Sequence, residues 1–315
     1  MVPYDCLLCI IMRLKDLRKD KEGLSKALLA IIVVVLLLAS TAAVVLMTMS
    51  GSSTNETVQN GDYVTLNYTG TVLINGVYKT FDTSLWTVAT DNSTYPKTCW
   101  FSAKSESSYS TLKFYVGKGT VVTGFDQGVL GMKVGEPKTI SISPSQGYGE
   151  MDTTKLTTFS INDNVPVFVT TTISKFASDF GAAAVVGLSM THPVYEWPVT
   201  VLSVDSNAGT VMYQNQPTIN TDYHIYGSSD AKVVAGWNIT VTSIESTVNE
   251  GAGQISFTNN IDDADSWEIQ GYNSAGSLFI LINVNTAAGT AVMNFNNPLK
   301  GQTMVFTVTV VAIRK

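Results

Sequence analysis

The sequence predicts an α+β fold that is mostly β, preceded by a membrane-spanning helix. Three observations support this prediction: residues 112–150 follow a strand, short helix, strand pattern, residues 198–298 contain three similar hairpin patterns, and residues 27–49 form an uncharged apolar run. Alternation of apolar and polar residues with a period of two is typical of half-buried strands. Helical periodicity is nearly absent after residue 150, so sheets should dominate the fold.

The apolar run at residues 27–49 predicts a transmembrane helix. At ~1.5 Å per residue it is long enough to cross a hydrocarbon layer of ~30 Å. A cleaved signal peptide is the alternative, but its apolar core is usually about 7–15 residues long. Lysines and arginines cluster in residues 1–26, and none occurs between Ala27 and Tyr78. By the positive-inside rule we expect a single-pass protein of the cell membrane, with residues 1–26 cytoplasmic and the bulk of the chain extracytoplasmic.

Residues 50–60 are small and polar, as is typical of a tether. The formal net charge of the chain is −6. Residues 1–26 contain more basic than acidic residues, so the net charge of the remaining residues is still more negative. Nucleic acid is therefore not an expected partner, because its recognition requires a basic surface.

Folded sequence is expected from Gly61. Residues 64–81 show two alternating strands joined near Asn75 and Gly76, a residue pair that tolerates the positive φ angles of a hairpin turn. Residues 84–111 form a long polar loop that contains several aromatic residues, and loops of this length are usually functional or mobile. The loop could be a rim over a binding pocket or structural filler.

The stretch at residues 112–150 is the most informative of the chain. An alternating strand pattern ends at Gly117, and a short segment follows in which Phe125, Val129 and Met132 share one helical face. The segment is too short to be stable alone and must pack on a sheet. A second strand then runs from residue 139 to residue 143.

Three segments after residue 150 share a pattern: residues 198–217, 238–261 and 278–298 each read as strand, glycine-containing turn, strand and Asn-rich stop. They predict a repeated β-hairpin unit, forming one or two domains. Trp197 and Trp237 introduce the first two hairpins and are more readily explained as hairpin core than as a ligand platform.

The usual catalytic and metal-binding patterns are missing from the sequence. His192 and His224 do not form an H-x-x-H or H-E-x-x-H spacing, so no metal site is expected. Residues 117–120 (GKGT) lack the spacing of either glycine-rich phosphate motif and predict a turn. No cofactor is expected.

Residues 121–136 fit the pattern V-V-x-G-F-x-x-G-x-x-G-M-x-x-G-E, and residues 148–150 read YGE. Upstream lie the strand VTLNYTG at residues 64–70 and the sequence FDTS at residues 81–84. Together these stretches resemble the FKBP family of peptidyl-prolyl cis-trans isomerases. The resemblance implies a half-wrapped antiparallel sheet around one short helix.

The resemblance also implies a proline-binding pocket that needs neither metal nor cofactor. Phe125 would form the floor under the proline ring. Val122 would donate its backbone N–H, and Tyr148 its hydroxyl, to the substrate. Asp82, oriented by Tyr68, would face the twisting carbonyl without acting as a general acid or base. The other expected pocket residues are Phe81, Leu112, Val121 and Phe306.

Some of these assignments have alternatives. Phe81 and Phe125 could be ordinary core, and Asp82 could be a turn or cap residue at the end of its strand. Leu112 stands where the family often has an aromatic residue, and Phe125 where many members have Trp. Both differences weaken stacking and keep the pocket apolar.

The end of the chain resembles the point at which FKBPs with a domain inserted in the flap return to the catalytic domain, as in membrane-anchored archaeal long-type members. The resemblance implies an isomerase domain at residues 61–160 plus 298–315. Residues 161–297 would be a β-hairpin-repeat insert with a chaperone-like role, and Phe306 would return to the pocket.

The sequence therefore favours a prolyl isomerase that assists the folding of exported or membrane proteins. Its partners would be proline-containing unfolded polypeptides, with the membrane contacted through one N-terminal helix. Two other hypotheses stay open: an FKBP scaffold that binds a peptide or a partner without catalysis, and a surface adhesion protein built on the hairpins.

Overall fold

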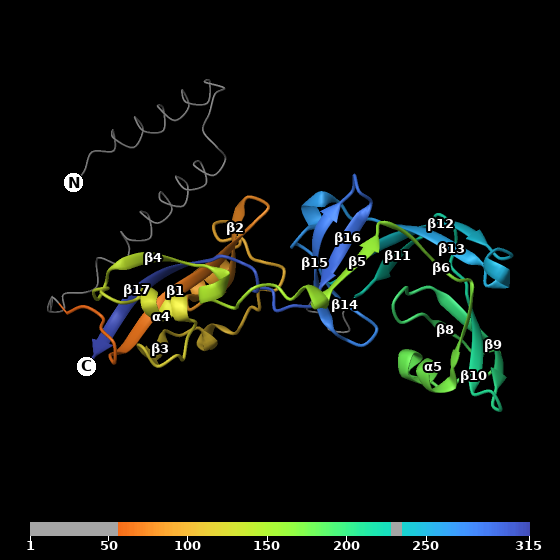
Figure 1. Cartoon of the computed structure of the whole chain (residues 1–315), viewed down its shortest axis with the longest axis horizontal. Helices are drawn as coiled ribbons and strands as arrows, with labels where there is room; N and C mark the ends of the chain where they lie inside the picture. The colour runs from red at the N-terminus through yellow and green to blue at the C-terminus, as the bar shows by residue number, and fades with distance from the viewer. Residues whose placement is uncertain (1–55, 228–234) are drawn as a thin grey trace, which may run out of the picture. The chain divides into compact units, whose positions relative to one another are not determined.

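The structure is a computed structural model that describes residues 56–227 and 235–315, and it is mostly β with few helices (Figure 1). Within these two ranges no helix is both long and apolar enough to cross a membrane. The expected cytoplasmic segment at 1–26, the expected span at 27–49 and the first half of the expected tether lie outside the described residues.

The first sheet contains five strands, all paired antiparallel. Its order is β2-β1-β17-β4, and β3 pairs with the first part of β1, before the segment of β1 that pairs with β2. The turn between β1 and β2 contains Asn75 and Gly76 at φ 49° and 80°, as a two-residue hairpin requires. The strands are β1 (Tyr63–Ile74), β2 (Val77–Thr83), β3 (Leu112–Tyr115), β4 (Pro137–Ile142) and β17 (Met304–Arg314).

Strand β17 comes from the end of the chain and lies between β1 and β4 (Figure 1). Its Phe306 is paired with Gly70 on one side and Ile140 on the other. Both paired residues lie far earlier in the sequence, so the sheet is complete only when the last strand of the chain has paired.

Helix α4 (Thr123–Gly128) is the predicted short helix, and it packs closely on β4. Phe125 is buried on its inner face. A Cβ atom on Gly128 would lie 2.4 Å from Cγ2 of Ile140, and one on Gly124 would lie 2.6 Å from Cγ2 of Ile142. These two glycines therefore allow the helix to approach the strand more closely than side chains would permit.

The strands from β5 to β16 form three further four-stranded sheets, called here the hairpin sheets. The three predicted hairpins are confirmed as β9-β10, β12-β13 and β15-β16, the central pairs of these sheets. In sheet order the strands are β7 (Phe168–Thr172), β10 (Thr210–Asn215), β9 (Pro198–Asp205) and β8 (Ser189–Thr191); β11 (Asp222–Ile225), β12 (Trp237–Glu245), β13 (Gln254–Asn259) and β6 (Asn162–Val165); and β14 (Gln270–Tyr272), β15 (Leu278–Asn285), β16 (Thr290–Asn294) and β5 (Leu156–Ser160).

Each hairpin sheet takes one edge strand from residues 156–172, in reverse order along the chain. Strand β5 pairs with β16, β6 with β13 and β7 with β10. Residues 156–160 were expected at the end of the first domain, but their backbone groups are satisfied by β16 instead. The change from the first sheet to the hairpin sheets therefore occurs before Leu156.

Each of the first two hairpins contains the same kind of buried polar contact, between a tryptophan and an asparagine. The indole N–H of Trp197 donates to Oδ1 of Asn215 at 2.9 Å, and that of Trp237 donates to Oδ1 of Asn259 at 2.7 Å. Both tryptophans are core residues, at 0% and 4% exposure. The third hairpin has Asn294 near the equivalent position, where no tryptophan donates to it and its Nδ2 is buried without a partner among the described residues.

His192 is enclosed in the first hairpin sheet as a hydrogen-bond acceptor. Its Nδ1 accepts the backbone N–H groups of Val194 at 3.1 Å and Tyr195 at 3.2 Å. Its ring packs edge-on against those of Phe180 and Trp197. Burial lowers the pKa of His192 to about 4. The weaker electrostatic attraction of Asp179 opposes that shift.

The folded state should therefore lose stability as the pH falls from about 6.5 to about 4, because the unfolded state then binds a proton that folded His192 does not. The full effect is at most about 3 kcal/mol. Urea unfolding of the full chain at pH 7.5 and pH 4.5 measures it. A His192→Gln variant, which keeps an acceptor but cannot titrate, should show a smaller acid destabilisation, and an equal loss in both proteins would contradict the prediction.

Candidate active site

The aromatic side chains of the first sheet and α4 converge on Phe125. Ring centroids lie 5.0 Å apart for Phe125 and Phe306, 6.3 Å for Phe125 and Tyr68, and 6.1 Å for Phe125 and Phe114. Phe81 reaches the same cluster through Phe306, at 5.5 Å. Most of these pairs meet edge to face, the arrangement that ring quadrupoles favour. Phe125 and Phe306 are buried, whereas Tyr68 and Phe81 are partly exposed, so the cluster has a dry floor and an accessible side.

Gly70 permits this convergence. It is paired with Phe306 on β17 and with Asp82 on β2. A Cβ atom at this position would lie 2.6 Å from Cζ of Phe81 and 2.7 Å from Cε1 of Phe306. Only glycine leaves room for both rings above the strand, a role that the sequence pattern did not reveal.

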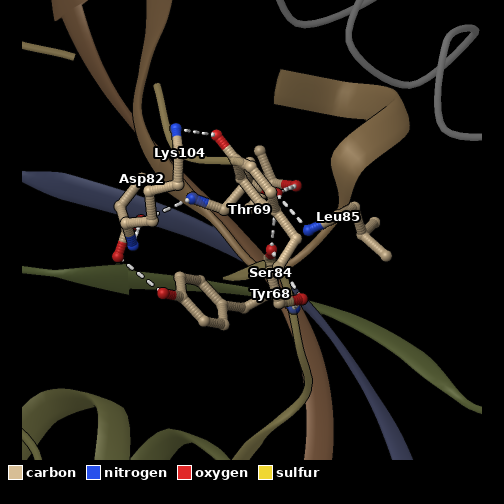
Figure 2. A network of polar contacts seen from close by, with 8 residues as sticks. Tyr68, Thr69, Asp82, Ser84, Leu85 and Lys104 are labelled. Atoms are coloured by element: carbon tan, nitrogen blue, oxygen red, sulfur yellow. Dashed lines mark hydrogen bonds and ion pairs between the residues drawn. The ribbon is translucent and has the colours of Figure 1, made fainter. Parts of the chain in front are cut away.

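Asp82 stands at the edge of the cluster and is held by Tyr68 (Figure 2). The Tyr68 hydroxyl donates to Oδ2 of Asp82 at 2.5 Å, and the backbone N–H of Thr83 donates to Oδ1 at 2.9 Å. Burial, followed by the hydrogen bond to Asp82, raises the pKa of Tyr68, so the hydroxyl remains a donor. Asp82 lies within β2 and accepts only the N–H of its immediate neighbour on the backbone side, so its carboxylate is oriented by Tyr68 and does not act as a helix cap.

The residues next to Asp82 fasten β2 to β1. Oγ of Ser84 accepts the backbone N–H of Tyr68 at 2.9 Å and donates to Oδ1 of Asn67 at 3.1 Å. The hydroxyls of Thr69 and Thr83 are 3.0 Å apart. Several of these contacts are drawn in Figure 2. They fix the register that brings Asp82 beside Tyr68.

The remaining expected pocket residues pack on the hydrophobic core of the first sheet. Leu112, Val121 and Val122 are partly buried against that core, which contains Phe125 and Phe306. Val122 is the N-cap of α4, its carbonyl oxygen accepts the backbone N–H of Phe125 at 2.9 Å, and its own N–H donates to no acceptor among the described residues.

Tyr148 differs from the other expected site residues because it is 43% exposed and outside the buried cluster. Its approach to Tyr68 is a minor cause, after burial and Asp82, of the raised pKa of Tyr68. Tyr148 is therefore near enough to Tyr68 to affect it electrostatically but is not part of the buried core.

The loop at residues 84–111 supplies Lys104, which the sequence analysis missed. The Nζ of Lys104 lies 3.7 Å from Oδ1 of Asp82. Trp100 from the same loop packs against the aromatic core. Lys97 holds the loop by donating to the carbonyl oxygens of Val88 and Asp91 at 2.9 and 3.0 Å. No periodic pattern marks Lys104, because its partner Asp82 is 22 residues away in the sequence.

A segment of the hairpin sheets also contacts the first sheet. Lys79 of β2 forms an ion pair with Glu268 at 2.5 Å, and Nδ2 of Asn75 donates to the carbonyl oxygen of Ala264 at 2.9 Å. Trp267 lies 6.1 Å from Trp100, between ring centroids, and packs on the same core. No local pattern indicates this contact, since the residues involved are more than 160 positions apart.

We predict that Gly70→Ala destabilises the protein by about 1–3 kcal/mol, because the added methyl group overpacks the rings of Phe81 and Phe306. Urea unfolding measures the loss. The same substitution made together with Phe81→Leu should cost clearly less than in the wild-type background, since leucine withdraws the ring atom nearest to the new methyl group. An equal cost in both backgrounds would mean that the ring contact is not the cause.

Comparison with known proteins agrees with this geometry. Residues 54–168 match the family model described as FKBP-type peptidyl-prolyl cis-trans isomerase. The chain is 38% identical over 95 residues to a short-type peptidyl-prolyl cis-trans isomerase of Methanocaldococcus jannaschii, and this alignment covers 30% of the chain and 53% of the relative. It is 38% identical over 92 residues to FK506-binding protein 2 of Dictyostelium discoideum, in an alignment that covers 29% of the chain and 51% of the relative.

A third relative, FK506-binding protein 2 of Aspergillus oryzae, is 51% identical over 47 residues, covering 14% of this chain and 35% of the relative. The chain thus spans about half or less of the length of these curated relatives. The family match at residues 54–168 includes Tyr68, Asp82 and Phe125 of the site and ends before Phe306. Residues 54–168 contain an FKBP-type peptidyl-prolyl isomerase domain.

Proposed function

We propose that this chain is a peptidyl-prolyl cis-trans isomerase whose site is the aromatic cluster around Phe125. The observation that carries the proposal is the combination of a buried aromatic floor, a carboxylate fixed at its edge and a backbone N–H at Val122 that has no acceptor among the described residues. Such a site can hold a proline ring and hydrogen-bond the peptide on either side of it.

Catalysis of this reaction requires no proton transfer. The barrier to rotation about an amide bond is ~18–20 kcal/mol and comes from the double-bond character of the C–N bond. An enzyme accelerates rotation by binding the twisted amide, in which that conjugation is lost, more tightly than the planar one. A dry ring-lined pocket assists, because water stabilises the planar and more polar ground state.

The roles of individual residues follow from their positions. Phe125 and Phe306 provide the apolar floor, and Tyr68 uses its hydroxyl to hold Asp82 rather than the substrate. The carboxylate of Asp82 would face the carbon of the twisting carbonyl as a fixed negative charge. Val122 would donate its N–H to a carbonyl of the peptide, and Tyr148 would donate its hydroxyl.

The substrates proposed are exported or membrane polypeptides, with the chain held at the membrane by residues 27–49. The support is the uncharged apolar run and its basic flank in the sequence. Anchoring would raise the effective concentration of the enzyme near emerging chains.

A chaperone-like role for the hairpin sheets is the further part of this proposal. Its support is a set of exposed apolar side chains on and beside the first of these sheets, which could bind unfolded segments. The residues and their exposures are Val185 (59%), Val186 (61%), Leu202 (39%) and Met212 (38%).

Isomerisation of a proline tetrapeptide by the full-length protein tests the proposed activity. Phe125→Ala should lower kcat/KM at least tenfold, a loss of ~1.4 kcal/mol of transition-state stabilisation, because the floor of the pocket is removed. Asp82→Asn, which keeps the shape and an acceptor for Tyr68, should lower kcat/KM by removing the charge alone.

The matched control is Asp205→Asn in a turn of the hairpin sheets, where the side chain only accepts backbone N–H groups, and it should leave kcat/KM unchanged. Binding of the peptide by the wild-type protein without any turnover would contradict the enzyme and support a non-catalytic binding module.

A further inference from the structure

Lys104 has bonding capacity that its contact with Asp82 does not use. The distance of 3.7 Å from its Nζ to Oδ1 of Asp82 exceeds that of a direct N–H···O hydrogen bond, which is about 2.7–3.2 Å. Asp82 already accepts a hydroxyl from Tyr68 and a backbone N–H from Thr83. The ammonium group, with three donors, is therefore loosely paired and available to another acceptor.

Both partners of this pair face solvent at the pocket edge. The side chain of Lys104 is 49% exposed and that of Asp82 is 42% exposed. A ligand in the aromatic cluster would lie beside Asp82, since Tyr68 contacts both the cluster and that carboxylate. A charged side chain next to the bound proline would then meet the Lys104 ammonium group.

The backbone at Lys104 is held by contacts within its own loop, whereas its side chain is only loosely paired. The N–H of Lys104 donates to the hydroxyl of Tyr109 at 3.0 Å, and the Tyr109 ring packs on Trp86 at 5.4 Å between centroids. The hydroxyls of Ser105 and Ser108 are 2.8 Å apart and close the turn between them. The lysine is thus presented at a constant place by a folded loop.

The charges at this edge decide whether Lys104 favours acidic or basic ligands. Among the described residues, Asp82 is the one acidic side chain within ion-pair distance of Lys104. With Lys104 present, the pair is neutral and offers spare donors. Without Lys104, the edge keeps only the negative charge of Asp82, which repels an acidic ligand and attracts a basic one.

We infer that Lys104 is a specificity-determining residue that favours proline peptides with a carboxylate side chain at the residue before proline. This inference rests on the proposed isomerase function and names the class of substrate that the site prefers. The interaction is exposed to solvent, so the expected preference for Glu over the neutral isostere Gln is modest, about two- to fivefold. It should shrink as salt is raised, because solvent-exposed charges are screened.

The test uses the full-length protein and tetrapeptides that differ only in Glu, Gln or Lys before proline. The wild type should show kcat/KM in the order Glu, Gln, Lys, and 0.5 M NaCl should narrow the differences. Lys104→Ala should reverse the order, and Lys104→Arg should retain it. The readout is the ratio of kcat/KM for Glu to that for Gln within each variant, because removal of Lys104 also changes the charge beside Asp82 and can alter turnover of every peptide.

Lys133→Ala is the matched control, because it removes one exposed lysine next to Val134, which pairs with Val310, four residues along β17 from Phe306. At ~3.3 Å per residue, Val310 is about 13 Å from Phe306 along the strand. This variant should keep the wild-type order.

An unchanged ratio of Glu to Gln in Lys104→Ala would overturn the inference, as would an equal change in Lys133→Ala. The affinities of fluorescently labelled versions of the same peptides give a second readout. Absence of turnover with every peptide would contradict the proposed isomerase, and the affinities would still decide the role of Lys104: equal affinities for Glu and Gln peptides in wild type and Lys104→Ala would overturn it.

Discussion

The structure depends on the antiparallel pairing of β17 between β1 and β4. Through this pairing the last residues of the chain complete a sheet whose other strands all lie before residue 143. Phe306 is delivered by that strand to the centre of the aromatic cluster, in contact with Phe81, Tyr68 and Phe125. Without β17 the pocket would lose one wall, and the inner edges of β1 and β4 would be unpaired. The pairing of β17 therefore completes both the first sheet and the aromatic cluster.

The polar edge of the site is a second consequence of strand register. Strand β1 pairs with β17 along one edge and with β2 along the other, so the position of Gly70 fixes both Phe306 and Asp82. Tyr68, two residues earlier, then reaches Asp82 and the cluster together. A rigid carboxylate beside a dry floor suits a reaction in which the enzyme must distinguish a twisted amide from a planar one, because preorganised charge costs no rearrangement.

Much of this arrangement could be predicted from sequence, because the informative residues are close together along the chain. The pattern around Phe125 combines turn glycines with apolar positions of helical spacing, and the hairpin at Asn75 and Gly76 is specified locally. What could not be predicted depends on long-range packing. The pairing of β5 with β16 is set by which edge is available, and Lys104 meets Asp82 only because an irregular loop folds back.

In the hairpin sheets, too, the local structure could be predicted from the sequence but the long-range pairing could not. Each hairpin is recognisable because its alternation and its turn are local, but each sheet is completed by a strand from residues 156–172 that runs past all three in reverse order. One continuous segment thus joins three repeats into a single core. Lys79 and Trp100 contact Glu268 and Trp267, in the segment between β13 and β14, and so connect that segment to the first sheet and its core.

Amide hydrogen exchange of the full-length protein tests the central role of β17 most directly. A buried central strand exchanges only when the sheet opens, whereas an unpaired terminal segment exchanges almost at once. The account predicts that peptides from residues 304–314 are protected as strongly as peptides from residues 63–74. Rapid exchange of residues 304–314 beside a protected β1 would contradict it.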